Sequence, residues 1–289
     1  MPSLLSSFSD EAGGTIDEQI DATKRAGLHF VDLRNGDGFN ITALPLHHAG
    51  TVAQKLRDAG LKVHMFGSPL GKIDIAEDFA IDARKMEHLA ALAPILDCRA
   101  VRIFSYYNKD KAPHDQWRRE SFRRLRKLTR IAEKSGMILY HENESHIFGD
   151  HCSEVLELAE LRDATFKMIF DFGNFNAGRE NAWDNWLQLA AVTDAIHLKD
   201  NAWGADGQLQ HVPVGQGGGH VQRILADAAA RNWTGPFTIE PHLTHSAAVA
   251  ATGPSGIPNQ SYANMPPGES FHIACLAAQA VLDRAGFGI

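Results

Sequence analysis

Four residues that can bind a divalent cation each end a short apolar run of the sequence. Glu142 ends MILYHE, Asp171 ends FKMIFD, His197 lies in DAIHLK, and Glu240 ends PFTIE. Consecutive members are 29, 26 and 43 residues apart, and one strand with its crossover helix and loops takes about 30 residues or more. Four successive parallel strands would therefore bring three carboxylates and one imidazole to one edge, as a candidate metal site.

The donor types predict the metal and its chemistry. Three oxygen donors and one imidazole suit Mn²⁺ or Mg²⁺ and also accommodate Co²⁺ or Zn²⁺. Such a metal can polarise a sugar carbonyl and stabilise the enediolate formed when a neighbouring C–H loses its proton. Glu142 and Glu240 are the candidate acid/base pair. If one carboxylate removes the proton and the other returns it on the opposite face, the result is epimerisation.

Each of the four also has an ordinary structural interpretation. An acidic residue at a strand end is commonly a helix N-cap, and Asp171, which precedes FGN, could form such a cap or an Asx-turn. His197 alone could be a hydrogen-bonded core histidine. The coincidence at four successive strand ends favours the metal site.

The apolar runs alternate with longer helical segments, which is the pattern of a parallel α/β protein. Thr15 and Glu18 predict a capping box, and Gly27, Gly60 and Gly136 are placed as helix C-cap glycines. Eight repeats predict a (β/α)8 TIM barrel with its active site at the C-terminal strand ends. The expected strands are 3–8, 29–34, 62–66, 100–104, 137–142, 166–171, 194–199 and 236–240.

A doubly wound open sheet is the alternative fold. It would need a glycine-rich phosphate loop, and the first strand–helix connection, FSDEAGGTIDEQ, lacks the GxGxxG spacing. No linker divides the chain, so we expect one domain over 1–289. Segments 200–218 and 241–269 are expected to be long loops over the catalytic face, because loops beyond about 12–15 residues are usually functional or disordered.

The composition indicates a globular enzyme. Of 289 residues, 44% are hydrophobic and 22% are charged, and no apolar run approaches the roughly 20 residues that span a bilayer. The N-terminus lacks secretory-signal features and the three cysteines lack CxxC spacing, so we expect a cytoplasmic protein. A net charge of −7 argues against a nucleic-acid partner. The cationic run 117–130 predicts an amphipathic helix with its arginines facing water.

Further polar residues lie in or after the expected strands and are candidates for binding substrate hydroxyls or an oxyanion, although each also has a structural alternative. They are Arg34, His64, Ser68, Lys72, Arg102, His146, Lys199 and His242. Other histidines are interpreted as ordinary polar loop residues. These are His151, His211, His220 and His245.

With these residues the sequence resembles the sugar phosphate isomerase/epimerase family, the xylose isomerase-like barrels. The resemblance runs from FSDEAGG through VDLRNGDG, GSPLGKIDI, VRIFSYY, HENESHIFGD, FDFGNF, IHLKD and VPVGQGGGHV to FTIEPHL. It implies a xylose isomerase-like TIM barrel in which Glu142, Asp171, His197 and Glu240 bind one divalent metal, often Mn²⁺. It also implies that Glu142 and Glu240 are catalytic and that the substrate is a small carbohydrate.

Two positions depart from the free-ketose 3-epimerases of that family. Those enzymes carry a His three residues after the metal Asp, where this chain has Asn174, and an Arg six residues after the metal His, where it has Trp203. The segments HENE…GD, FD..NF and EPHL resemble instead a subgroup that acts on 3-keto glycosides and includes a 4-epimerase. The resemblance therefore implies an epimerase or isomerase of a keto-sugar or 3-keto glycoside.

Three other functions remain to be weighed. A lyase would use the same enolisation to eliminate the aglycone of a 3-keto glycoside. An apurinic endonuclease would need a multi-zinc site with more histidine ligands and a basic DNA-binding face. A non-catalytic sugar-binding barrel would have no need of paired glutamates. The sugar, its phosphorylation, the natural metal and the base among the two glutamates stay open at this point, as does homo-oligomer formation.

Overall fold

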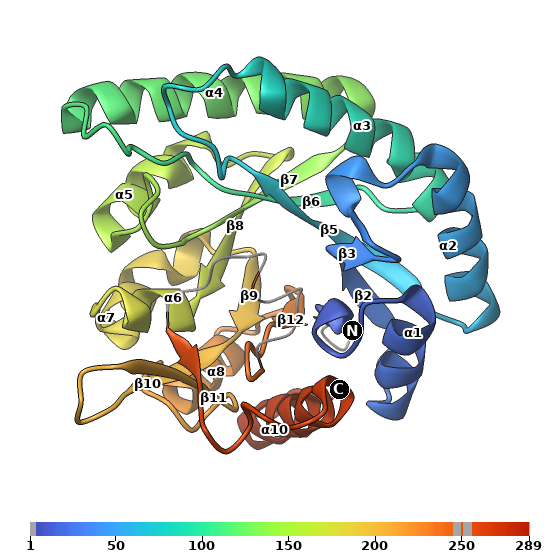
Figure 1. Ribbon diagram of the computed structural model, residues 1–289. Coiled ribbons are helices and arrows are strands. Elements are labelled where there is room, and N and C mark those ends of the chain that lie inside the picture. The colour runs from blue at the N-terminus through green and yellow to red at the C-terminus, as the bar shows by residue number, and fades with distance from the viewer. Residues whose placement is uncertain (1–3, 245–249, 251–255, 289) are drawn as a thin grey trace.

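The computed structural model describes residues 4–244, 250 and 256–288. Within them, eight parallel strands form a nearly closed barrel with helices around it (Figure 1), which confirms the predicted (β/α)8 fold. All eight coincide with expected apolar runs. The barrel strands are β1 (Leu5–Ser7), β2 (Phe30–Leu33), β5 (Lys62–Leu70), β6 (Ala100–Ile103), β7 (Ile138–Glu142), β8 (Phe166–Asp171), β9 (Ala195–Leu198) and β12 (Phe237–Ile239).

The helices follow the barrel strands along the chain. The α-helices are α1 (Ile16–Arg25), α2 (Leu46–Asp58), α3 (Ala80–Leu96), α4 (His114–Ser135), α5 (Cys152–Leu158), α6 (Phe172–Ala177), α7 (Ala182–Leu189), α8 (Val221–Ala230) and α10 (Pro267–Ala285). Single 3-10 turns are η1 (Ser9–Glu11), η2 (Ile41–Ala43), η3 (Ala159–Leu161) and η4 (Ala190–Val192). None of the helices in the described part of the chain is long and apolar enough to cross a membrane.

The strand order brings the four candidate ligands together. Neighbouring strands follow the order β1-β12-β9-β8-β7-β6-β5-β2, so β7, β8, β9 and β12 are consecutive and parallel. The register places Asp171 beside His197 and His197 beside Thr238. Between β1 and β2, Ser6 Oγ donates a hydrogen bond of 2.6 Å to the buried Asp32 carboxylate. This bond links the two strands that no backbone ladder joins.

The predicted helix ends are confirmed. Thr15 and Glu18 exchange side-chain and backbone hydrogen bonds at the start of α1, which completes the capping box. Gly27, Gly60 and Gly136 adopt positive φ angles of 71°, 74° and 66° directly after helices or their last turns. Glycine reaches this left-handed region without the steric cost that a Cβ brings.

The cationic run forms part of α4, which buries Leu125, Leu128 and Ala132 on one face, and this confirms the predicted amphipathic helix. One arginine differs from the expected water-facing position. Arg124 is 3% exposed, and its guanidinium donates hydrogen bonds to three backbone carbonyl oxygens of segment 74–77. These carbonyl oxygens lie between β5 and α3, outside the named strands and helices, and hydropathy patterning does not detect their need for a donor.

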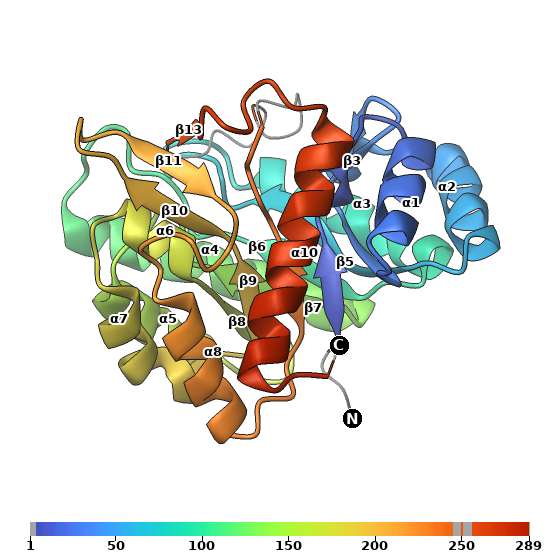
Figure 2. The ribbon, with the colours of Figure 1, turned by 90° about the horizontal axis from the view of Figure 1, so that it is seen from below.

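The segment 200–218 contains secondary structure that the sequence analysis did not predict. Strands β10 (Asp200–Trp203) and β11 (Leu209–Val212) form an antiparallel hairpin, and β13 (Ile257–Pro258), from the expected loop 241–269, pairs with β11. Figure 2 shows these strands together at the end of the molecule opposite the two termini. A smaller hairpin, β3 (Asn35–Gly36) with β4 (Phe39–Asn40), follows β2. Residues 245–249 and 251–255 lie outside the described residues.

The glycine cluster after the hairpin is explained by Asp200. Its carboxylate accepts hydrogen bonds from the backbone N–H groups of Gly215, Gly217 and Gly219, at 2.8 to 3.0 Å. A Cβ at Gly217 would lie 2.3 Å from both the Asn201 carbonyl oxygen and the Asp200 carboxylate. Glycine is therefore required there by close approach of the backbone, and Asp200 holds the loop in place.

Candidate metal centre and active site

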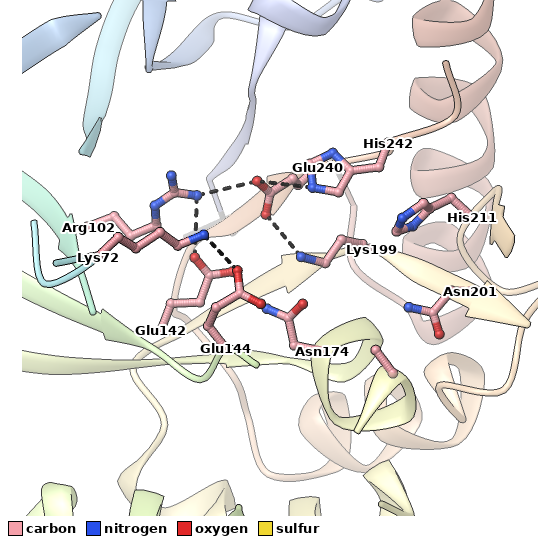
Figure 3. A pocket seen from close by; sticks show the side chains of 11 residues that line it. Lys72, Arg102, Glu142, Glu144, Asn174, Lys199, Asn201, His211, Glu240 and His242 are labelled. Carbon is pink, nitrogen blue, oxygen red and sulfur yellow. Dashed lines mark hydrogen bonds and ion pairs between the residues drawn. The ribbon is translucent and has the colours of Figure 1, made fainter. Parts of the chain in front are cut away.

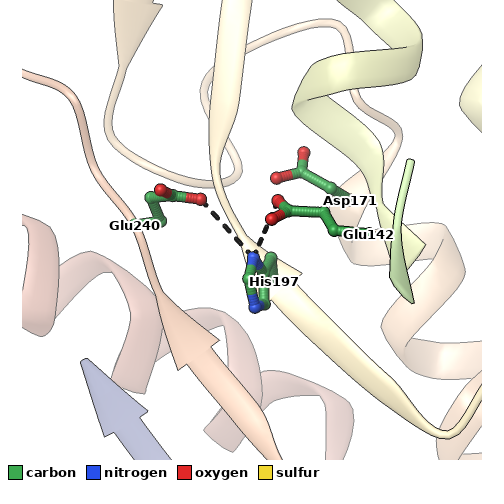
Figure 4. A group of neighbouring side chains, drawn as sticks. All are labelled: Glu142, Asp171, His197 and Glu240. Carbon is green, nitrogen blue, oxygen red and sulfur yellow. Dashed lines mark hydrogen bonds and ion pairs between the residues drawn. The ribbon is translucent and has the colours of Figure 1, made fainter. Parts of the chain in front are cut away.

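The structure brings together the four residues that the sequence predicts as ligands. Glu142, Asp171, His197 and Glu240 are all buried, and one ligand atom from each lies within 4.8 Å of all the others. His197 Nδ1 is 2.9 Å from Glu142 Oε1 and 3.4 Å from Glu240 Oε2. Figure 4 shows Glu240 on one side of the imidazole, with Glu142 and Asp171 on the other.

Asp171 caps a helix, as its structural interpretation predicts, and also belongs to the cluster of four side chains. Its Oδ1 accepts a hydrogen bond of 2.9 Å from Asn174 N and so caps α6. Its Oδ2 lies 3.0 Å from Lys199 Nζ. The backbone on either side of the carboxylate is held by Asn143, whose amide both donates to the Asp171 carbonyl and accepts from the Asp171 N–H. The cap therefore fixes the direction in which the second oxygen points.

The donor set fits a divalent metal. Glu142 Oε2 and Asp171 Oδ2 are buried and have no hydrogen-bond partner among the described residues. Leaving a buried charged acceptor without hydrogen bonds costs more than about 1–3 kcal/mol. The two oxygens have ion-pair partners instead, Arg102 at 3.3 Å and Lys199 at 3.0 Å. A cation coordinated between the four side chains would satisfy these oxygens directly.

The electrostatics of the cluster follow from burial and close charges. Burial, with the charges of Glu142 and Glu240, raises the pKa of Asp171 to about 7 against the opposing effect of Lys199. Burial acts to lower the pKa of His197, but Glu142 and Glu240 together raise it to about 10. The pKa of Glu142 falls to about 2, because the attraction of His197 and Arg102 exceeds the effect of burial. The cluster is thus a charged site with cations balancing its carboxylates.

Glu240 contacts three further cationic side chains. Its Oε1 lies 2.9 Å from Arg34 Nη1 and 3.3 Å from Arg102 Nη1, and its Oε2 lies 3.5 Å from Lys199 Nζ. Burial raises the pKa of Glu240, but the attraction of Lys199 and other neighbouring cations holds it well below its ordinary value. With His242 Nε2, which lies 3.7 Å from Oε1, four of the predicted substrate-binding residues therefore contact this carboxylate.

Two acidic residues missed by the sequence analysis support this side of the site. Asp10 accepts two hydrogen bonds of 2.9 Å from the Arg34 guanidinium. Glu11 accepts hydrogen bonds from His242 Nδ1 and His242 N, at 2.9 and 2.7 Å. His242 has a φ of 49°, a strained conformation that surrounding contacts must maintain. The sequence feature that could have identified them is the pair of acidic residues directly after the first strand, in FSDEAGG.

An inner pocket lies beside the cluster and is bounded by Glu142 and Glu240 (Figure 3). Four predicted substrate-binding residues line it, namely Lys72, Arg102, Lys199 and His242. Four further polar residues, which were not predicted to bind substrate, also line the pocket: Glu144, Asn174, Asn201 and His211.

The structure explains how two of these four residues reach the pocket. Glu144 forms an ion pair of 2.9 Å with Lys72. His211, expected to be an ordinary polar loop residue, is instead buried on β11 and packs edge-on against the His242 ring, with centroids 5.2 Å apart. The hairpin that carries His211 into the pocket was not predicted, so the position of this histidine could not be inferred.

The remaining candidates lie elsewhere. Arg34 lines a neighbouring hollow together with Lys72 and Arg102. Ser68 is buried and donates a hydrogen bond to the Arg102 carbonyl oxygen, so it supports the strand rather than the pocket surface. His64 lies near the start of β5 and lines neither hollow, because the strand ends that form the site are at the opposite end.

The other histidines are on the periphery. His146 is exposed and lines a separate, outer hollow. His151 forms an ion pair of 2.9 Å with Glu180 on the surface. His220 is the N-cap residue of α8, in a left-handed conformation. His245 lies outside the described residues.

Several solved structures share this fold. A zinc-bound IOLI protein superimposes with a TM-score of 0.73 at 14% identity, over 100% of both chains. The probable 3-DHS dehydratase AsbF from Bacillus anthracis gives 0.71 at 18% identity, over 96% of this chain and 99% of that one. The 3-keto-D-glucoside 4-epimerase YcjR from E. coli gives 0.66 at 12% identity, over 96% and 100%.

One of the two sequence comparisons identifies a family. No curated protein matches the sequence. The family described as xylose isomerase-like TIM barrel matches residues 20–257, a stretch that contains all four cluster residues. The chain belongs to the xylose isomerase-like TIM barrel family.

Proposed function

We propose that the protein is a divalent-metal-dependent epimerase or isomerase of a keto-sugar or 3-keto glycoside. The observation that carries this proposal is the placement of two buried glutamates, Glu142 and Glu240, on opposite sides of His197 Nδ1. Reversible removal of a proton from one face of a carbon and return on the other requires two such groups on opposite sides of one small space.

The metal is proposed to be held by Glu142, Asp171, His197 and Glu240. Bound there, it would supply Lewis-acid polarisation of the substrate carbonyl. The zinc in the IOLI structure and the activity named for YcjR support the choice of a metal-dependent sugar enzyme. Oxygen-rich donor sets favour Mn²⁺ or Mg²⁺ over softer metals, and we propose Mn²⁺ as the natural ion.

The chain's own residues would act on the substrate as follows. One glutamate takes the proton from the carbon beside the carbonyl, and the other delivers a proton to the opposite face. Arg102 Nη1 lies 3.3 Å from both Glu142 and Glu240, so it can hold their charges in place as the proton moves. Lys72, Lys199 and His242 line the same pocket and are proposed to bind substrate oxygens.

A lyase is the second candidate function. The same base would remove the proton, the electron pair would form the carbon–carbon double bond, and the C–O bond to the aglycone would break. The second glutamate would then protonate the leaving oxygen. Two observations favour keeping this candidate: a dehydratase is among the structural neighbours, and a roomy outer hollow adjoins the inner pocket.

Proton NMR in D₂O tests the proposal. Protein loaded with Mn²⁺ or Mg²⁺ is incubated with a panel of free ketoses and 3-keto glucosides, with metal-stripped protein as the control. Deuterium should appear beside the carbonyl of at least one panel member only with the loaded protein. An epimerised sugar indicates the epimerase, and a released aglycone indicates the lyase. Absence of exchange with the whole panel would contradict the proposed chemistry.

A further inference from the structure

A second, larger hollow opens beside the inner pocket. This outer hollow has a volume of about 520 Å³. It is formed where the β10–β11 hairpin and β13 meet the loop that follows β7. Among its lining residues are His146, Asp150, Trp203, Gln208 and Ile257. None of the described residues that line it is lysine or arginine, so its chemistry differs from that of the cation-rich inner pocket.

The two hollows are neighbours that share a lining residue. Ala177, at the end of α6, lines both of them. Glu144 lines the inner pocket, and the next residue, Ser145, lines the outer hollow. A ligand whose reacting group lies among the cluster carboxylates could therefore continue past the small Ala177 side chain into the outer space. The inner pocket has a volume of only about 10 Å³, so it would admit the reacting end of a ligand, and the rest of the ligand would lie in the outer hollow.

Trp203 gives the outer hollow a fixed aromatic wall. Its side chain is 36% exposed at the end of β10. The indole Nε1 donates a hydrogen bond of 2.9 Å to the Asn176 carbonyl oxygen. The Arg179 guanidinium lies 3.7 Å from the ring centroid. An exposed indole held at its edge and stacked by a cation is ordered before any ligand arrives, which lowers the entropy cost of binding.

The lining suits a hydroxylated ring. The C–H bonds of a pyranose pack against the electron-rich face of an indole. The polar side chains of His146, Asp150 and Gln208 offer donors and acceptors for ring hydroxyls. Arg179 is stacked on the Trp203 ring, and no lysine or arginine is among the described residues that line the hollow, so the lining itself offers no cation for a phosphate or carboxylate group.

We propose that the outer hollow binds a second sugar ring, joined through its glycosidic oxygen to the keto-sugar in the inner pocket. The substrate is then a keto-disaccharide rather than a free ketose. This inference rests on the proposed function for the position of the reacting ring, and it adds a subsite with Trp203 as its main contact.

Binding of unreactive sugars tests the subsite directly. NMR titrations compare methyl glucoside with glucose disaccharides of several linkages, for the parent protein and for Trp203→Ala. At least one disaccharide should bind the parent protein about three- to tenfold more tightly than methyl glucoside, as one aromatic stacking contact provides. Trp203→Ala should reduce that advantage to less than about twofold. Equal binding of all sugars by the parent, or an unchanged advantage in Trp203→Ala, would overturn the proposal.

Trp183→Ala is the matched control. Arg223 lies 3.8 Å from the Trp183 ring centroid, so this tryptophan is also stacked by an arginine, but it lines neither hollow. Trp183→Ala should still bind the disaccharide more tightly than methyl glucoside, as the parent protein does. Circular dichroism of both variants checks that the fold is intact.

Deuterium exchange separates failure of the subsite from failure of the proposed function. Trp203-dependent disaccharide binding without exchange into any keto-sugar would leave the subsite standing and overturn the proposed function. The second outcome is exchange into both methyl 3-keto-glucoside and 3-keto disaccharides, with a ratio of their kcat/KM values that Trp203→Ala does not alter. This outcome would support the proposed function and overturn the subsite. A ratio that falls about three- to tenfold in Trp203→Ala supports both.

Discussion

His197 Nδ1 lies 2.9 Å from Glu142 Oε1, although the two residues are 55 positions apart in the sequence. The contact depends on the parallel register of three consecutive strands, in which Glu142 on β7 pairs with Ile169 on β8, and Asp171 on β8 pairs with His197 on β9. Because strand backbones carry these side chains, their spacing is set by the barrel ladder rather than by loops. Such rigid elements hold a catalytic constellation more closely than loops do.

The paired glutamates give the first prediction. Glu142→Gln and Glu240→Gln should each lower the rate of deuterium exchange by about 10²–10⁴-fold, because an amide cannot take or return a proton. Thermal unfolding should show that both variants remain folded. Glu133→Gln, on the exposed face of α4, is the matched control and should behave as the parent. Parent-like exchange in either glutamate variant would remove that residue from the acid/base pair.

The second prediction concerns the metal. Treatment with a chelator should abolish exchange, and Mn²⁺ should restore it. His197→Ala removes one of the four donors whose atoms lie within 4.8 Å of one another, so its metal content by elemental analysis should fall well below one ion per chain. Asp171→Asn should also lose metal, because an amide is a weaker ligand than a carboxylate. A His197→Ala protein that held one full equivalent would contradict the ligand assignment.

The sequence was sufficient to predict the barrel and the proximity of the four candidate residues, because both depend on one periodic signal. Each of the four residues lies at or near the end of an apolar run with the length of a buried strand, and parallel strands end at the same edge. The contacts that surround these four side chains depend on other information. Glu11 and His242 are 231 residues apart, and their hydrogen bond arises where the first and last barrel strands meet, which no local pattern describes.

His64 and Ser68 do not line the inner pocket, for different reasons. His64 lies near the start of β5, and only the C-terminal end of a barrel strand reaches the site. Ser68, which follows the expected strand 62–66, lies within β5 and donates to the Arg102 carbonyl oxygen instead. His211, in contrast, lines the inner pocket, although it was expected to be an ordinary loop residue. Its hairpin has polar, glycine-flanked strands without a continuous apolar run, so the segment was expected to be a loop.

A third prediction concerns stability at acid pH. Hydrogen bonds from Arg123 and then Arg124 lower the pKa of Glu120 to about 2, although burial opposes this. A carboxyl whose folded pKa is below its unfolded value stabilises the protein above the unfolded pKa, and this contribution is lost as the pH falls toward about 2. The free energy lost in Glu120→Gln should therefore be larger at pH 7 than near pH 2.5, by urea unfolding. An equal loss at both pH values would show that the carboxylate charge contributes nothing. The effect should be small because the ion pair is partly exposed to solvent.

The last prediction tests Glu11 as a positioning residue. Its carboxylate accepts from both His242 N and His242 Nδ1 and also contacts Arg34 at 3.3 Å, so it holds two side chains that approach Glu240. Glu11→Gln removes the charge but keeps the shape, and kcat should fall about 10–100-fold, as when the hydrogen-bond partner of a site histidine is lost. KM should rise as well, because Glu11 holds His242, which lines the inner pocket and is proposed to bind substrate oxygens. A purely structural role would lower the thermal midpoint and leave kcat per folded molecule unchanged, so both quantities must be measured on the same preparation.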